Sequence, residues 1–132
     1  MSVEIREISE KEIWVEKCKV ELGDDGIFYQ SLAGDIDEEI VAALQKAFLK
    51  LINLVNGDII AFVDLSESGM QYSKARKKAI AGFEQMKIKK IALYGVHPVA
   101  KVIANFFMSA ANNDKVRMFN SKEKALEWLA SN

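Results

Sequence analysis

Polar and apolar residues alternate along the first third of the chain with the period of two that is typical of β-strands. The alternation predicts strands over residues 3–8 and 13–22. The sequence GDDG at residues 23–26 predicts a turn, and IFYQSL then predicts a returning strand. We therefore expect the chain to begin with strands that are joined by a β-hairpin.

Apolar residues recur at the helical spacing after this segment. Asp35, with Glu38 three residues later, matches the pattern in which two side chains satisfy free backbone N–H groups at a helix start. Asn56 and Gly57 tolerate the left-handed backbone with which many helices end. Together these signals predict one long helix over residues 36–55.

Strands and helices alternate in the rest of the chain. Short apolar runs predict strands at DIIAFVDL, KIALYG and VRMF. Between them the sequence predicts a loop rich in Ser and Gly at residues 66–72, a helix capped by Ser73 and a helix over residues 98–111. Asn120 or Ser121 then caps a terminal helix. The alternation favours an α/β fold with a mostly parallel sheet, flanked by about four helices.

Length and composition agree with this interpretation and exclude several classes of protein. The 132 residues, half of them hydrophobic, suit one compact domain over residues 1–132. The net charge of -1 gives no overall attraction for nucleic acid. The single cysteine, Cys18, excludes an internal disulfide and agrees with a reducing compartment. No stretch approaches the roughly 20 apolar residues of a membrane span, so we expect a cytoplasmic protein without a transmembrane segment.

The order of four segments resembles a known family. These are GDIDEEIVAAL, IIAFVDLS, KIALYGVHPVAKVIANFF and VRMFNSKEKALEWLA. Their order and spacing resemble the STAS fold of anti-sigma-factor antagonists, and more closely its SpoIIAA-like branch, which is related in fold to CRAL-TRIO lipid-binding domains. The resemblance implies a small non-enzymatic domain that binds a protein partner or a ligand.

Ser73 is the first candidate that this resemblance indicates. In partner-switching antagonists a phosphoacceptor serine opens the helix after the central strand, and in QYSKAR the matching position is Ser73, preceded by Tyr72. The acid and the glycine that usually flank that serine are missing here. From the residues alone, three roles stay open for Ser73: a helix cap, a phosphoacceptor or a ligand contact.

The cations after Ser73 are the second candidate. Lys74, Arg76 and Lys77 lie in the first turns of the predicted helix, where cations are unfavourable beside the positive end of the helix dipole. The cluster is either a solvated basic face or a site for an anion, an acidic protein surface or a lipid headgroup.

The predicted helix over residues 98–111 has more apolar residues than one sheet face can cover, among them Phe106 and Phe107. We therefore expect a homodimer or an apolar ligand there.

The leading hypothesis is a non-enzymatic regulatory or binding module that acts on a protein or small-ligand partner. The alternative is a carrier or sensor of a small amphipathic anion, such as a fatty acid or lipid, with the basic helix start near its acidic head.

Enzymatic hypotheses find less support. Asp64 ends an apolar strand, as the phosphoacceptor of a receiver domain does, but no pair of acids ends the first strand. His97 is the only histidine, so neither a zinc site nor a Cys–His pair is indicated. YGVHP lacks the spacing of a phosphate-binding loop. A hydrolase or transferase using Ser73 or His97 is the weakest hypothesis, and we predict no catalytic residues, metal or cofactor.

Overall fold

The computed structural model describes residues 3–71, 73–95 and 115–131, which form seven strands and three helices. In chain order the elements are β1 (Ile5–Ser9), β2 (Glu12–Val15), β3 (Cys18–Leu22), β4 (Phe28–Ile36), α1 (Glu38–Ile52), β5 (Ile60–Gln71), α2 (Ser73–Met86), β6 (Lys90–Tyr94), β7 (Val116–Phe119) and α4 (Lys122–Ala130). The prediction gave about four helices, and the expected helix over residues 98–111 lies outside the described residues.

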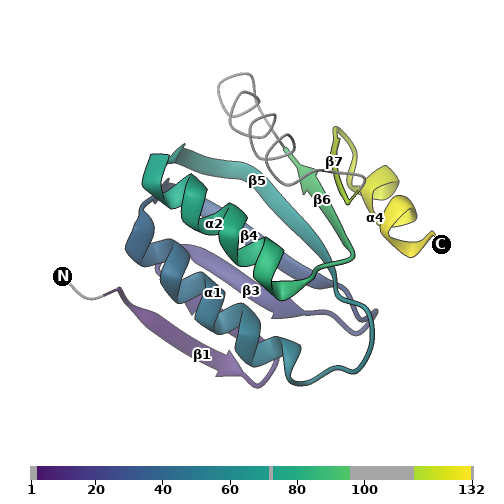
Figure 1. Cartoon of the computed structure of the whole chain (residues 1–132), viewed down its shortest axis with the longest axis horizontal. Coiled ribbons are helices and arrows are strands. Elements are labelled where there is room, and N and C mark those ends of the chain that lie inside the picture. Colours follow the sequence, from purple (N-terminus) through teal and green to yellow (C-terminus); the bar gives the residue numbers. More distant parts are fainter. Residues whose placement is uncertain (1–2, 72, 96–114, 132) are drawn as a thin grey trace.

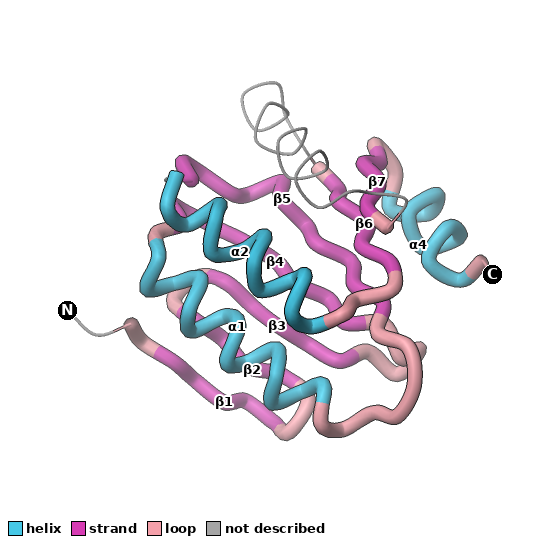
Figure 2. The backbone as a smooth tube through the Cα atoms, viewed as in Figure 1, coloured by secondary structure: helices cyan, strands magenta, loops and turns pink. Residues whose placement is uncertain are grey.

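The seven strands form one sheet whose spatial order follows the chain, from β1 to β7. Neighbouring strands are antiparallel from β1 to β4 and parallel from β4 to β7. This confirms the α/β class and the parallel second half, and it replaces the single leading hairpin with an antiparallel meander of four strands. Figure 2 shows the described helices packed along the sheet.

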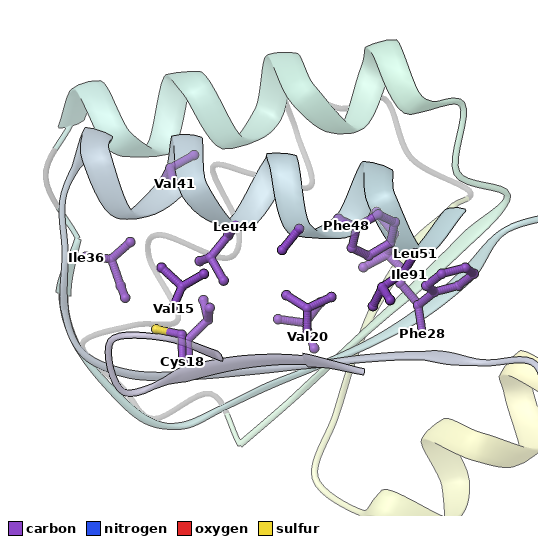
Figure 3. Close-up of a cluster of buried hydrophobic side chains, with 14 of the residues drawn as sticks. Val15, Cys18, Val20, Phe28, Ile36, Val41, Leu44, Phe48, Leu51 and Ile91 are labelled. Atoms are coloured by element: carbon purple, nitrogen blue, oxygen red, sulfur yellow. The ribbon is translucent and has the colours of Figure 1, made fainter. Parts of the chain in front are cut away.

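The sheet has a helical layer on each face. α1 and α2 cover one face, and α4 lies on the opposite face (Figure 3). The larger group of buried apolar residues lies under α1 and α2, and a smaller group, which includes Phe62, Ala92 and Leu129, lies under α4. The stacked rings of Phe28 in β4 and Phe48 in α1, with centroids 5.1 Å apart, join the sheet to α1.

The strand that was predicted over residues 13–22 is two strands. Glu16 adopts a left-handed backbone with φ of 53°, and the chain reverses there so that Val15 pairs with Cys18. Glutamate is uncommon in this conformation, and the segment contains none of the Gly or Asn residues that usually mark a two-residue turn. The buried apolar residues change from odd positions, Ile13 and Val15, to even positions, Cys18, Val20 and Leu22, so the break in alternation at Glu16 and Lys17 was the signal of the turn.

The long helix starts and ends inside its predicted limits. Asp37 caps α1, because its carboxylate accepts a hydrogen bond from the N–H of Ile40 at 2.9 Å. The predicted cap, Asp35, belongs to β4, which continues to the buried residue Ile36. The helix ends at Ile52, so Gly57, whose φ is 109°, lies in the following loop rather than at the helix end.

β5 is longer than predicted, because residues 66–71 are strand rather than loop. Its second half pairs with the end of β4, where Gly34 opposes Ser68. The pairing is irregular there, and the buried hydroxyl of Ser68 donates a hydrogen bond to the carbonyl of Leu65 at 2.8 Å. Serine and glycine therefore mark an irregular strand here, which local sequence signals do not distinguish from a loop.

Other predicted boundaries are confirmed. Ser73, which was predicted as the cap of α2, is its first helical residue, one position from the prediction. Ser121 caps α4 by accepting a hydrogen bond from the N–H of Lys124 at 3.3 Å. Ala125 and Leu129 are buried under α4 as expected. Among the described helices, none is long and apolar enough to cross a membrane.

We expect Phe28→Ala to lower the free energy of unfolding by about 3–5 kcal/mol, because it removes a fully buried ring and leaves a cavity against Phe48. Urea denaturation measures the change. Ile8→Ala is the matched control, since Ile8 is 58% exposed and its truncation should cost less than about 0.5 kcal/mol. Equal effects of the two substitutions would contradict this description of the core.

Candidate binding cleft

A cleft of about 250 Å³ opens on the sheet face opposite α1 and α2, between the central strands and α4. Its walls come from three strands and one helix. The lining residues are Lys19, Glu21, Tyr29, Ser31, Phe62, Asp64, Lys122 and Leu126.

The pairing of β3, β4 and β5 places the strand residues of the cleft in two rows. Lys19 opposes Ser31, which opposes Asp64, and this makes a polar row across the sheet. In the neighbouring row Glu21 opposes Tyr29, which opposes Phe62. Because side chains alternate between faces along a strand, the residues between these rows point to the α1 side.

Aromatic rings form the floor of the cleft and continue toward β6. The rings of Tyr29 and Phe62 have centroids 5.7 Å apart, and those of Phe62 and Tyr94 are 5.8 Å apart. Phe62 is buried, whereas the two tyrosines are half-buried. The floor is therefore a continuous aromatic surface on a hydrogen-bonded sheet.

The charged residues of the cleft differ in how far they are already paired. The ammonium of Lys19 lies 3.5 Å from the carboxylate of Glu21. Asp64 accepts hydrogen bonds from both the N–H and the hydroxyl of Ser66, at 2.9 and 2.6 Å. Lys122 lies over the ring of Tyr94 at 5.9 Å, and within the described part of the chain its ammonium has no carboxylate partner. Lys122 is therefore the cation that is most available to a ligand.

α4, which carries Lys122 and Leu126, is attached to the sheet through Lys90 of β6. The ammonium of Lys90 donates hydrogen bonds to the carbonyls of Trp128 and Ser131, at 2.8 and 2.6 Å. It also lies over the indole of Trp128, 5.1 Å from the ring centroid. A cation at the carbonyl end of a helix is electrostatically favourable, so Lys90 helps to set the position of the helical wall.

Tyr29 is held in its neutral form. Burial raises the pKa of Tyr29 to about 12, and the hydrogen bond that its hydroxyl donates to Asp25, at 2.5 Å, acts in the same direction. The negative charges of Asp25 and Glu21 raise it further. At neutral pH Tyr29 therefore contributes a ring and a bound hydroxyl rather than a phenolate.

The four predicted site residues that the structure describes are on α2 and do not line this cleft. Ser73 begins α2, and Lys74 and Lys77 are exposed on that helix, which also contains Arg76 in its first turns. β5 continues from Asp64 to Gln71 before α2 starts, a distance of roughly 20 Å at about 3.3 Å per residue. The start of α2 and the cleft are therefore separate. The other four predicted residues, Tyr72, His97, Phe106 and Phe107, lie outside the described residues.

Sequence reasoning proposed none of the cleft residues as ligand contacts, although it considered Asp64. One signal in the sequence could have indicated the cleft. Alternate positions on three strands are polar or aromatic rather than aliphatic, as Lys19 and Glu21 are in one strand and Tyr29 and Ser31 in another. Over the described ranges, no group of three or more His, Cys, Asp or Glu side chains is placed to hold a metal ion.

The fold is α/β and SpoIIAA-like, as solved structures with similar folds show. The chain is similar to an uncharacterized protein of the DUF3478 family with a SpoIIAA-like fold from Shewanella loihica PV-4, at 14% identity over 98% of this chain and 94% of that one, with a TM-score of 0.65. It is also similar to the anti-sigma factor antagonist SpoIIAA in its unphosphorylated form, at 10% identity over 99% of this chain and all of that one, with a TM-score of 0.56. At these identities the likeness concerns the fold alone.

The sequence itself matches one family. Residues 23–132 fit the family described as a domain of unknown function, DUF7793, and the chain belongs to it. A search of curated proteins finds no significant match. The matched residues include all the strands and helices of the cleft except β3, which ends at Leu22.

The raised pKa of Tyr29 predicts a loss of stability at alkaline pH. Its ordinary pKa is 10.0 and its folded-state pKa is about 12, so the folded protein holds this proton more tightly than the unfolded chain. The stabilisation is fully present below about pH 10 and is lost as the pH rises through about 12. Urea unfolding between pH 9 and pH 11.5 should therefore show a steeper decrease for the native protein than for Tyr29→Phe. Parallel decreases would show that Tyr29 does not hold its proton in this way.

Proposed function

We propose that the protein is a non-enzymatic binding module of the STAS-like type whose partner site is the cleft between the sheet and α4. The observation that carries the proposal is the combination, on one rigid sheet face, of an aromatic floor with charged side chains of both signs at its rim. Concave, mostly apolar surfaces with a few placed polar groups are typical of binding sites.

The state of the polar groups supports binding rather than catalysis. Asp64 is occupied by two hydrogen bonds from Ser66, a local arrangement in which an aspartate orders the residues that follow it. Tyr29 donates a hydrogen bond to Asp25, and its raised pKa keeps the phenol protonated, so that at neutral pH it is not available as a base. A catalytic site needs a nucleophile and a base that are held together and accessible to a substrate, and the described lining residues do not provide this pair.

The size of the cleft favours a protein partner. Its volume of about 250 Å³ lies below the roughly 300–1,000 Å³ of pockets that enclose a small molecule. It is large enough for one or two side chains that a partner inserts between Phe62 and Leu126. The charges of both signs then give specificity by pairing with polar groups at the rim of the partner.

The partner hypothesis is tested with Leu126→Arg, which places a charge in the cleft wall from a half-buried position. We expect this variant to lose a partner that the native protein captures, while Lys124→Glu, on the exposed side of the same helix, retains it. The partner is then purified and titrated against the three proteins by calorimetry. We expect at least a tenfold weaker affinity for Leu126→Arg. Equal affinity for all three, with unchanged thermal melting, would place the interface elsewhere.

A small amphipathic anion is the second candidate, and one observation favours it. Lys122, without a carboxylate partner in the described structure, stands beside the apolar surface of Phe62 and Leu126. This arrangement fits a short acyl or aromatic carboxylate whose acidic end meets Lys122. The sequence-based hypothesis used the cations at the start of α2 for the acidic end of the ligand, whereas this proposal uses Lys122 of α4.

Two probes of equal length and opposite charge, octanoate and octylammonium, distinguish this candidate. We expect octanoate, and not octylammonium, to shift the amide NMR signals of Tyr29, Phe62 and Lys122. Lys122→Glu should weaken octanoate binding about tenfold, because a charge-assisted hydrogen bond is worth about 1.5–3 kcal/mol. Lys124→Glu controls for the change of net charge. Similar shifts with both probes would indicate apolar adsorption without recognition of the anion.

A further inference from the structure

The outer edge of β1 has no partner strand in the part of the chain that the structure describes. β1 lies at one edge of the sheet (Figure 1), and only β2 pairs with it. All five of its residues are exposed, and Ile5 and Ile8 are exposed by 51% and 58%. An open edge with exposed apolar side chains is a template for another strand.

The pairing with β2 determines which backbone groups of β1 point outward. The carbonyl of Glu4 accepts a hydrogen bond from the N–H of Glu16 at 2.9 Å, so the backbone of Glu4 faces β2. In an antiparallel pair, hydrogen-bonded and non-hydrogen-bonded positions alternate. The backbone groups of Arg6 therefore also face β2, and those of Ile5 and Glu7 point away from the sheet.

The same register determines the faces on which the side chains lie. Ile5 opposes Val15, which is buried on the α1 side of the sheet, and Glu7 forms an ion pair with Lys50 of α1. Arg6 opposes Trp14 on the other face, with its guanidinium 5.5 Å from the centroid of the indole ring. Glu4 is on this second face too, and its carboxylate lies 3.3 Å from the guanidinium of Arg6.

We propose that two copies of the chain pair antiparallel through the outer edges of β1, with the two-fold axis at Ile5. In this register Ile5 meets its own copy, and the outward backbone groups of the two residues can exchange hydrogen bonds. Glu4 of each copy opposes Arg6 of the other. The four side chains then form a cluster of alternating charge on one face, and the two Ile5 side chains meet on the other.

Charge selects this register over its neighbours. A two-fold axis at Glu4, Arg6 or Glu7 places that charged residue directly opposite its own copy, which is unfavourable in a sheet. Registers centred between two residues are excluded, because each residue would then oppose its sequence neighbour in the other copy. One of the two would have its backbone groups pointing toward the partner and the other away from it, and their side chains would lie on opposite faces. Of the axes at residues 4–7, only the one at Ile5 opposes unlike charges.

An irregularity in β1 limits the length of the paired segment. The register with β2 shifts between Glu7 and Ser9, and such a shift bends an edge away from a straight partner. The regular part of the edge is therefore short. Since few residues are buried, the dimer should be weak and should depend on protein concentration. The cleft lies on β3 to β5 and α4, so pairing leaves it open.

Disulfide crosslinking tests the register directly. In a hydrogen-bonded antiparallel pair the Cα atoms are about 5.5 Å apart, which is within the range for disulfides. We expect Ile5→Cys to form a covalent dimer under mild oxidation and Ile8→Cys, equally exposed on the same strand, to form much less. Cys18 is buried and stays in both variants. Equal crosslinking of the two variants, or more from Ile8→Cys, would overturn the proposal.

Charge reversal provides an independent test by analytical ultracentrifugation. Arg6→Glu should weaken the dimer at least fivefold, and the double variant Glu4→Arg with Arg6→Glu should restore it, because the opposed charges are exchanged. Lys17→Glu, exposed in the turn after β2, makes the same change of net charge outside the interface. Thermal melts verify that each variant is folded. A native protein that stays monomeric at millimolar concentration, or a double variant that remains as weak as Arg6→Glu, would contradict this register.

Discussion

The parallel pairing of β4 with β5 is the constraint on which both faces of the molecule depend. Their register runs from Phe28 opposite Ala61 to Ile36 opposite Gln71. Because neighbouring side chains point to opposite faces, the register that buries Phe28 against α1 also brings Tyr29 beside Phe62. A slip of one residue in β4 would move Tyr29 out of the aromatic floor into the core and Phe28 into the cleft. The register of β4 with β5 therefore determines both the core and the cleft, and a shift of that register would change both together.

Local signals in the sequence were sufficient for much of the fold. Apolar periodicity and capping residues predicted the order of the described elements from β4 onward and the cap of α4 at Ser121, because these features depend on residues close in the chain. They failed where a distant strand decides the conformation. Asp37 rather than Asp35 caps α1, since Ile36 is still paired with β5. Glu16 turns in a conformation that its residue type does not favour, because the flanking strands pair across it.

The cleft was harder to predict than the fold. Its residues come from four elements, and the chain segments between them carry no motif. Lys19 and Ser31 become neighbours only through the register of β3 with β4, and Lys122 reaches the cleft because α4 lies on the face opposite α1. The cations of α2 were easy to notice because Lys74 and Lys77 are close in sequence. The cleft, in contrast, combines residues that are far apart in the chain, such as Lys19 and Lys122, which are about 100 positions apart.

The attachment of α4 through Lys90 has a consequence for motion. The apolar cluster beneath α4 has five buried residues, against 22 in the cluster beneath α1 and α2, counted over the described residues. Because the free energy of local opening depends on the apolar surface that opening exposes, α4 can detach from the sheet while the other layer stays folded. Breaking the contacts of Lys90 with Trp128 and Ser131 would be part of this opening. From the described residues we therefore expect the wall of the cleft to open at a lower free energy than the layer of α1 and α2. A partner that binds against both sheet and helix would slow hydrogen exchange in α4 more than in α1, by an amount that depends on its affinity.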